Sequence, residues 1–485
     1  MATRCDTILR DVTIFDGSGG PRRHGDVAIG GDRIAGVGDL AAWSADREIV
    51  ATGKAVAPGF IDAHTHDDRA VLCGPACMLC KMSQGVTTVV VGNCGISLSP
   101  VPMKTRPIPP LDLLGDESWW VFSSFGEYAE RLQKDPSPVN TVALIGHMSL
   151  RVEAMQGDTQ RAATGGEAEK MRKRLAESLA EGASGFSTGL YYPANNCAPT
   201  EEVIAVAEAL RAAGGLYVTH MRDESRDVLP SIEETLHIGR AVDVPVIISH
   251  HKCAQPENFG RSVETLPLIE RAARTQKVDF DVYPYIAGST VLMLKKLHDG
   301  VPTRITWSVL YPEMQGRWLH DIAEQWGVSL REAAAKLLPA GGVFFQMDEA
   351  DVRRIMAHPR SMIGSDGLPH DSFPHPRLWG TFPRVLGHYA RDLQLFSLET
   401  AVHKMTGRVA DVFGLADRGV IRTGAFADLV LFDPETVRDA ADFDNPTLPA
   451  EGIAETWVGG RSAYVFGQGA TAARAGRLVT QGGMS

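Results

Sequence analysis

The segment GFIDAHTH, residues 59–66, is a short apolar run that ends in two histidines separated by one residue. Alternate side chains of a strand point to the same side, so His64 and His66 are expected to face one direction. Seven more apolar segments follow and alternate with helical patterns: TTVVVGNC (87–94), TVALIGH (141–147), GFSTGL (185–190), LYVTH (216–220), VPVIISH (244–250), VDFDVYPY (278–285) and SMIGSD (361–366). Strands that alternate with helices in this way predict an α/β fold, a TIM-like (β/α)8 barrel.

The two ends of the chain differ from this barrel region, which covers 59–415. Residues 1–58 contain short alternating strands broken by Gly and Asp, and the same texture returns in 416–485. Both ends are therefore expected to build one small β domain. The connection between the last two barrel strands is far longer than a typical βα loop and contains helical pieces near 312–327, 330–338 and 347–358. Residues 286–345 are expected to form an inserted subdomain, or a lid over the site.

The composition limits the kinds of molecule that the protein is expected to bind. Of 485 residues, 44% are hydrophobic and 22% charged, which is ordinary for a globular protein. The net charge of −11, without a long basic block, argues against nucleic-acid binding. No apolar run suits a membrane span and the first residues lack a signal-like stretch, so a cytoplasmic protein with a small-molecule substrate is expected. The seven cysteines do not form a disulfide pattern, and the oligomeric state is left open.

Potential metal ligands follow five of the predicted strands. Active sites of such barrels form at the C-terminal ends of the strands, where these residues stand: His64, His66, Cys94, His220, His250 and Asp366. Nitrogen and sulfur donors with a carboxylate favour Zn²⁺ over Mg²⁺ or Ca²⁺, which prefer oxygen. A catalytic zinc takes about three protein ligands and leaves one position for water. Cys94, His220 and His250 supply such a set.

The remaining donors allow two interpretations. His64, His66 and Asp366 are expected to surround an adjacent position, which holds a second, weaker metal or only orients the water. Asp366 either supports a ligand histidine or acts as the general base toward water and then as the general acid toward a leaving nitrogen.

Longer motifs along the chain resemble those of a known family. PGFIDAHTH, GVTTVVVGNCGIS, THMRDE, ISHHK, IGSDGLPHD, HPRLWGTFPRVLGHYARDL and GAFADLVLFDP resemble the D-aminoacylases, the N-acyl-D-amino-acid deacylases of the amidohydrolase superfamily. The resemblance implies a barrel flanked by a small β-sandwich, with an insertion late in the barrel. It also implies zinc-dependent hydrolysis of N-acyl-D-amino acids to a carboxylate and a free D-amino acid.

Site roles follow from the same resemblance. Cys94, His220 and His250 match the ligands of a tightly held zinc, and Cys94 takes the place of a carboxylated lysine found in hydantoinase-like relatives. His64, His66, Cys94 and Asp366 match a weaker second site, and Asp366 matches the catalytic acid and base. The substrate's α-carboxylate is expected to bind three side chains: Lys252, Tyr283 and Arg377.

The preferred substrate side chain is less determined. Residues 292–296, Leu-Met-Leu-Lys-Lys, are expected to form the specificity region. Their apolar members favour hydrophobic or broadly varied D-amino acids, whereas Lys295 and Lys296 leave an N-acyl-D-glutamate deacylase as the alternative.

Three other functions are alternatives to this one. Cys73, Cys77 and Cys80 form C-x₃-C-x₂-C, the spacing by which radical enzymes hold an iron–sulfur cluster, although the segment also suits an apolar loop-to-helix stretch with packed cysteines. A non-catalytic scaffold is disfavoured because all six donors are present. A cyclic-amide hydrolase is disfavoured because GFSTGL offers no lysine.

Overall fold

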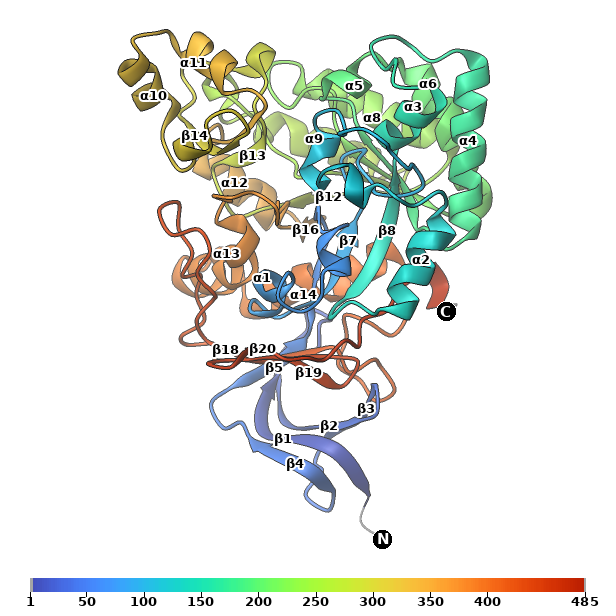
Figure 1. Cartoon of the computed structure of the whole chain (residues 1–485). Coiled ribbons are helices and arrows are strands. Elements are labelled where there is room, and N and C mark those ends of the chain that lie inside the picture. The colour runs from blue at the N-terminus through green and yellow to red at the C-terminus, as the bar shows by residue number, and fades with distance from the viewer. Residues whose placement is uncertain (1–2, 484–485) are drawn as a thin grey trace.

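The centre of the computed structural model, which describes residues 3–483, is a barrel of eight parallel strands (Figure 1). The strands pair in chain order: β6 (Phe60–Asp62), β7 (Val86–Val91), β8 (Asn140–Gly146), β9 (Gly185–Gly189), β10 (Leu216–His220), β11 (Val246–Ile248), β12 (Val278–Val282) and β16 (Ser361–Ile363). The ends of the sheet meet, because the backbone N–H of Ala63 donates to the carbonyl of Ile363 at 3.2 Å. The predicted barrel is confirmed, and each of its eight strands falls on a predicted segment.

Helices cover the outside of the barrel. They are α1 (Leu79–Met82), α2 (Phe125–Lys134), α3 (His147–Ala154), α4 (Gly165–Ala180), α5 (Pro193–Asn196), α6 (Thr200–Ala207), α7 (Ala209–Ala213), α8 (Val228–Val242), α9 (Ser262–Ala272), α12 (Glu349–Ala357), α13 (Arg377–Arg384), α14 (Leu398–Met405) and α15 (Gly407–Phe413). Helix α4 shows why they form: Thr164 and Glu167 cap its first turn reciprocally, and Met171 and Leu175 bury one face. Within residues 3–483, no helix combines the length and apolarity that a bilayer span requires.

The long connection before β16 has a sheet and a core of its own. Strands β13 (Gly288–Val291), β15 (Ala340–Phe344) and β14 (Thr303–Ser308) pair antiparallel in that order, beside helices α10 (Leu319–Trp326) and α11 (Leu330–Leu337). Ile305, Ile322 and Leu337 are buried in its separate apolar cluster. The predicted helical pieces are present, whereas the three strands were not expected. The limits of the subdomain, 286–345, stay a prediction.

The N-terminal and C-terminal regions of the chain both contribute strands to a second sheet below the barrel (Figure 1). Its nine strands are β1 (Arg4–Ile14), β2 (Arg23–Gly30), β3 (Arg33–Gly38), β4 (Ser44–Val50), β5 (Ala55–Pro58), β17 (Leu429–Phe432), β18 (Ile453–Val458), β19 (Arg461–Val465) and β20 (Gly469–Ala470). Strand β5 joins the halves by pairing with β1 and β17, and Val27 and Trp457 share one core. The expected small β domain is therefore present; its limits, 1–58 and 416–485, stay a prediction, and residues 1–2 and 484–485 lie outside the described residues.

A buried lysine holds the first and last barrel strands together. Lys81 on α1 donates to Asp62 Oδ2 at 2.8 Å and to Ser365 Oγ at 2.7 Å, and its Nζ lies 3.3 Å from Asp67 Oδ2. Asp62 Oδ1 also accepts from the backbone N–H of Ser365 at 2.7 Å. Since all of these side chains are buried, the ionic group fixes the two chain segments that flank His64 and Asp366.

Replacing this lysine leaves two buried carboxylates without their cation. We expect Lys81→Met to lower the free energy of unfolding by about 3–5 kcal/mol, measured by urea denaturation. The control is Lys173→Met, because Lys173 is 76% exposed in its ion pair with Glu177. The control should change stability by less than about 1 kcal/mol, and equal losses in the two variants would contradict the assigned role of Lys81.

Candidate metal centre

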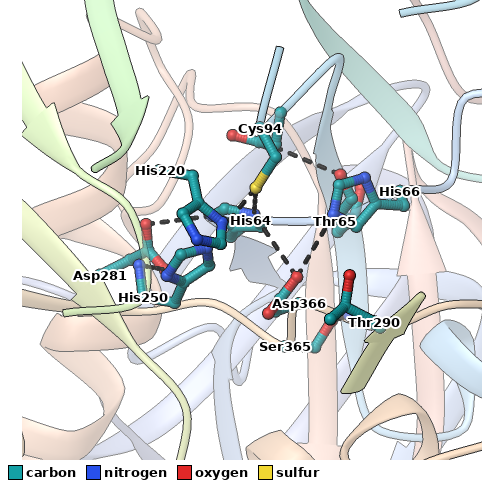
Figure 2. A network of polar contacts seen from close by, with 12 residues as sticks. His64, Thr65, His66, Cys94, His220, His250, Asp281, Thr290, Ser365 and Asp366 are labelled. Atoms are coloured by element: carbon teal, nitrogen blue, oxygen red, sulfur yellow. Dashed lines mark hydrogen bonds and ion pairs between the residues drawn. The ribbon is translucent and has the colours of Figure 1, made fainter. Parts of the chain in front are cut away.

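The six predicted donors converge at the mouth of the barrel, where Figure 2 shows their side chains turned toward one another. Cys94 Sγ lies 3.3 Å from His64 Nε2 and 3.5 Å from His250 Nε2. Asp366 Oδ1 lies 3.3 Å from His66 Nε2 and 3.6 Å from His64 Nε2. The rings of His220 and His250 are 4.4 Å apart, edge to face. The donors come from the ends of five strands, with His64 and His66 both following β6, as the sequence predicted.

The spacing of the donor atoms suits metal coordination. Three overlapping groups have ligand atoms within 4.8 Å of one another: His64, His66 and Cys94; Cys94, His220 and His250; and His64, His250 and Asp366. Within the described chain, the buried Nδ1 atoms of His66 and His220 have no hydrogen-bond partner. Burying a polar atom without a partner is unfavourable. The donor set and its unsatisfied nitrogens therefore fit a bound metal ion.

The backbone turns sharply where three of the donors stand. Cys94, His250 and Asp366 have positive φ angles of 54°, 36° and 50°. Non-glycine residues adopt this conformation rarely, at a cost of about 1–3 kcal/mol each, and mostly where surrounding structure imposes it. Just past strands β7, β11 and β16, the turns keep these side chains at the barrel mouth.

Neighbouring charges keep the two acidic donors ionised. Burial opposes ionisation of Cys94, but His64 and His250 hold the pKa of its thiol well below the usual range. Burial also opposes ionisation of Asp366, but Arg377 and His66 hold the pKa of that carboxyl well below its usual value. A thiolate and a carboxylate are the forms that bind metal ions.

Two carboxylates that the sequence analysis missed support the donors from behind. Asp281 on β12 lies 3.3 Å from His64 Nδ1 through Oδ2, and its Oδ1 accepts from the backbone N–H of His250 at 2.9 Å. Glu224 Oε1 lies 2.9 Å from His250 Nδ1. Carboxylates in this position fix the ring orientation of ligand histidines. The available signal was an acidic residue within the predicted strand 278–285, and a second one four positions beyond His220.

The three predicted carboxylate-binding residues lie beside the donors. Lys252 and Tyr283 line the same cavity as His220, His250 and Asp366, and the Arg377 guanidinium lies 4.6 Å from the centre of the Tyr283 ring. Both cations also have carboxylate partners within the protein. Lys252 Nζ donates to Glu224 Oε1 at 2.7 Å, and Arg377 Nη1 lies 2.9 Å from Asp366 Oδ2. The sequence did not reveal these pairings.

The cysteine motif is not part of this centre. Over residues 3–483, the groups of close metal-ligating side chains involve only the six donors, so Cys73, Cys77 and Cys80 do not form one. Cys73 donates to the carbonyl of Arg69 at 3.3 Å and Cys80 to that of Cys77 at 3.7 Å, while Cys77 is exposed. The segment enters the short helix α1, as the apolar loop-to-helix interpretation has it.

A parallel barrel with histidine, cysteine and aspartate ligands at its mouth defines a metal-dependent barrel enzyme by its fold and its site. The chain belongs to the amidohydrolase family, whose model matches residues 47–264 and 313–464. The unmatched stretch between them includes β13 and β14 of the insertion.

Comparisons with individual proteins agree with this membership. The chain is 51% identical to D-aminoacylase of Alcaligenes xylosoxydans xylosoxydans, covering 98% of both chains. It is 49% identical to N-acyl-D-aspartate deacylase of the same organism, over 99% of this chain and 96% of the relative. A structure of N-acyl-D-glutamate deacylase from Bordetella bronchiseptica, complexed with zinc and a phosphonate mimic of the tetrahedral intermediate, matches with a TM-score of 0.94 and 43% identity, over 98% of this chain and 100% of that one.

Removing the thiolate tests the centre directly. Because Cys94 takes part in two of the three donor groups, Cys94→Ala should weaken zinc binding at least about tenfold, measured by competition with a chromophoric chelator. Cys5→Ala is the matched control, since Cys5 is a buried cysteine on β1 of the distant small domain. Wild-type zinc affinity in Cys94→Ala would show that the metal binds elsewhere.

Proposed function

We propose that this protein catalyses the zinc-dependent hydrolysis of N-acyl-D-amino acids to a carboxylate and a free D-amino acid. The observation that carries the proposal is one cavity, lined by His220, His250 and Asp366 together with Lys252 and Tyr283. Three of the metal donors and two of the proposed carboxylate-binding residues thus face the same cavity. The relatives named above support the D configuration and the linear amide, because they are D-aminoacylase and deacylases of N-acyl-D-aspartate and N-acyl-D-glutamate.

The metal would be held by two overlapping sets of residues. Cys94, His220 and His250 would hold one zinc ion tightly, and His64 and His66 with Cys94 and Asp366 would form a weaker second site. A bound zinc ion supplies Lewis-acid polarisation of the amide carbonyl and lowers the pKa of a water molecule toward neutrality.

Asp366 lies between the two groups of residues that the proposed reaction would use. Its Oδ1 faces His64 and His66, and its Oδ2 faces Arg377, so the carboxylate lies between the metal donors and the carboxylate anchor. We assign it the role of general base toward the attacking water. The same group then protonates the leaving nitrogen, which releases the free amino acid.

The anchor holds the amino-acid end of the substrate. Lys252 Nζ and the Arg377 guanidinium lie 5.8 Å and 4.6 Å from the Tyr283 ring centre, so two cations flank one phenol. A guanidinium binds a carboxylate with two parallel hydrogen bonds, and an ammonium adds a point charge. Because Arg377 lies 2.9 Å from Asp366, an α-carboxylate held by Arg377 would bring the adjacent amide nitrogen toward the proton donor.

Two kinds of amino-acid side chain are candidates for the preferred substrate. Tyr191 and Phe344 give the cavity apolar walls, which supports hydrophobic or broadly varied D-amino acids. Lys296 favours the second candidate, an acidic side chain such as that of D-glutamate. Lys296 lines the cavity, its Nζ lying 4.1 Å from the centre of the Tyr191 ring and 3.7 Å from Asp223 Oδ2.

The proposed proton carrier is tested by an isosteric change. Asp366→Asn keeps the shape but cannot accept the proton, so kcat for N-acetyl-D-methionine should fall by about 10²–10⁴-fold while metal analysis still finds the tightly held zinc. Asp371→Asn is the control, because Asp371 lies five residues farther along the chain and does not line the cavity. Near-normal turnover in Asp366→Asn would rule out the assigned role.

Replacing Lys296 distinguishes the two candidate substrates, with Lys295 as the control. If the acidic preference holds, Lys296→Met should lower kcat/KM for N-acetyl-D-glutamate by about 10–100-fold, the worth of one charge-assisted hydrogen bond, with little change for N-acetyl-D-methionine. Lys295→Met should alter neither value, because Lys295 is exposed and does not line the cavity. Equal effects of Lys296→Met on both substrates would support the hydrophobic or broad preference instead.

A further inference from the structure

We propose that Glu224 is a positioning residue that joins the metal ligands to the substrate's carboxylate anchor, so that metal affinity and carboxylate recognition both depend on it. The proposal deepens the proposed function and rests on it for the identity of the anchor. Glu224 lies four residues past His220, in the loop after β10, and it is 5% exposed.

One oxygen of Glu224 completes a tight triangle with two cavity residues. Glu224 Oε1 lies 2.9 Å from His250 Nδ1 and 2.7 Å from Lys252 Nζ, and those two nitrogens are 2.7 Å apart. The second oxygen, Oε2, lies 3.4 Å from His220 Nε2. A single carboxylate therefore contacts two of the residues proposed to hold the tight zinc and one residue proposed to hold the substrate.

The backbone makes this arrangement rigid. The carbonyl of Glu224 accepts from the backbone N–H of Ala254 at 2.7 Å, which ties the loop after β10 to the loop after β11. Glu224 can thus reach His250 and Lys252 although they lie on a different strand connection. The contact thus joins buried side chains of two loops that are also linked through their backbones.

On the metal side, Glu224 orients a ligand. His250 presents Nε2 to Cys94 at 3.5 Å and Nδ1 to Glu224, so the ring spans from the donor cluster to the carboxylate. A carboxylate on the outer nitrogen of a ligand histidine fixes its orientation and raises its basicity, and its loss typically costs 10–100-fold in metal affinity.

On the substrate side, Glu224 holds the anchor's ammonium. Lys252 is buried and, in the part of the chain that the structure describes, its only ion pair is with Glu224. Without that carboxylate, the ammonium loses the group that holds it at the cavity wall beside His250. Substrates that carry an α-carboxylate should then bind less well, whereas substrates that lack it should be little affected.

The experiment compares Glu224→Gln, Lys252→Met and the double variant, with Glu234→Gln as control. Glu234 likewise pairs with a cation, Arg222 at 2.7 Å, but contacts none of the donors. Zinc affinity is measured by chelator competition, which needs no turnover. KM and kcat are then measured at saturating zinc for an N-acetyl-D-amino acid and for its α-carboxamide.

We expect Glu224→Gln to weaken zinc binding about 10–100-fold and to raise KM for the acid but not for the amide. Lys252→Met should raise KM for the acid while leaving zinc affinity near wild type. The double variant should show a KM no higher than Lys252→Met alone, because both changes disable one anchor. Glu234→Gln should change neither quantity.

Wild-type zinc affinity in folded Glu224→Gln, or additive effects on KM, would overturn the proposal. If Glu224→Gln does not fold, Glu224→Asp is measured instead; it keeps the charge with a shorter reach, and smaller losses of both kinds are expected. Wild-type values in Glu224→Asp would then overturn it. If the wild-type protein released no amine from any N-acyl-D-amino acid, the proposed function would fail, while the zinc titrations would still decide whether Glu224 orients the metal ligands.

Discussion

The structure depends on one constraint: a thiolate and a carboxylate must remain charged among four imidazoles at a buried barrel mouth. Isolated charges are costly in such surroundings. Each acidic donor has a cationic or histidine neighbour: Arg377 lies beside Asp366, and His64 lies beside Cys94. Removing one partner of such a pair leaves the other with an uncompensated buried charge. The donors therefore depend on one another for their stability.

Support for the donors extends outward in layers. Asp281 and Glu224 sit behind the histidines, and Lys81 joins the segments that flank His64 and Asp366. The insertion adds a third layer, because the carbonyl of Ser289 on β13 accepts from Arg377 Nη2 at 3.1 Å, and Thr290 Oγ1 lies 3.0 Å from Tyr192 OH. The insertion therefore contacts Arg377 and contributes Gly288, Ser289 and Thr290 to the cavity wall.

The sequence predicted the barrel well because its signals are local. Strand ends and ligand types are both readable along the chain, so His220 at the end of LYVTH and Cys94 after TTVVVGN could be assigned to one mouth. Contacts between loops are not local, which is why Glu224 and the pairing of Arg377 with Asp366 were missed. Two of the three strands in the insertion were missed because AGGVF and GSTV are short and rich in glycine or small polar residues, unlike the β-branched runs of the barrel. The third, TRITWS, has β-branched and aromatic residues that could have predicted a strand.

We propose that Cys94, His220 and His250 together hold the catalytic zinc ion. A crystal of the zinc-loaded protein, with anomalous diffraction measured on both sides of the zinc absorption edge, tests it most directly. We expect a strong zinc peak about 2.3 Å from Cys94 Sγ and about 2.0–2.1 Å from one ring nitrogen each of His220 and His250. A zinc peak bound instead by Cys73, Cys77 and Cys80, or none at the barrel mouth, would contradict it.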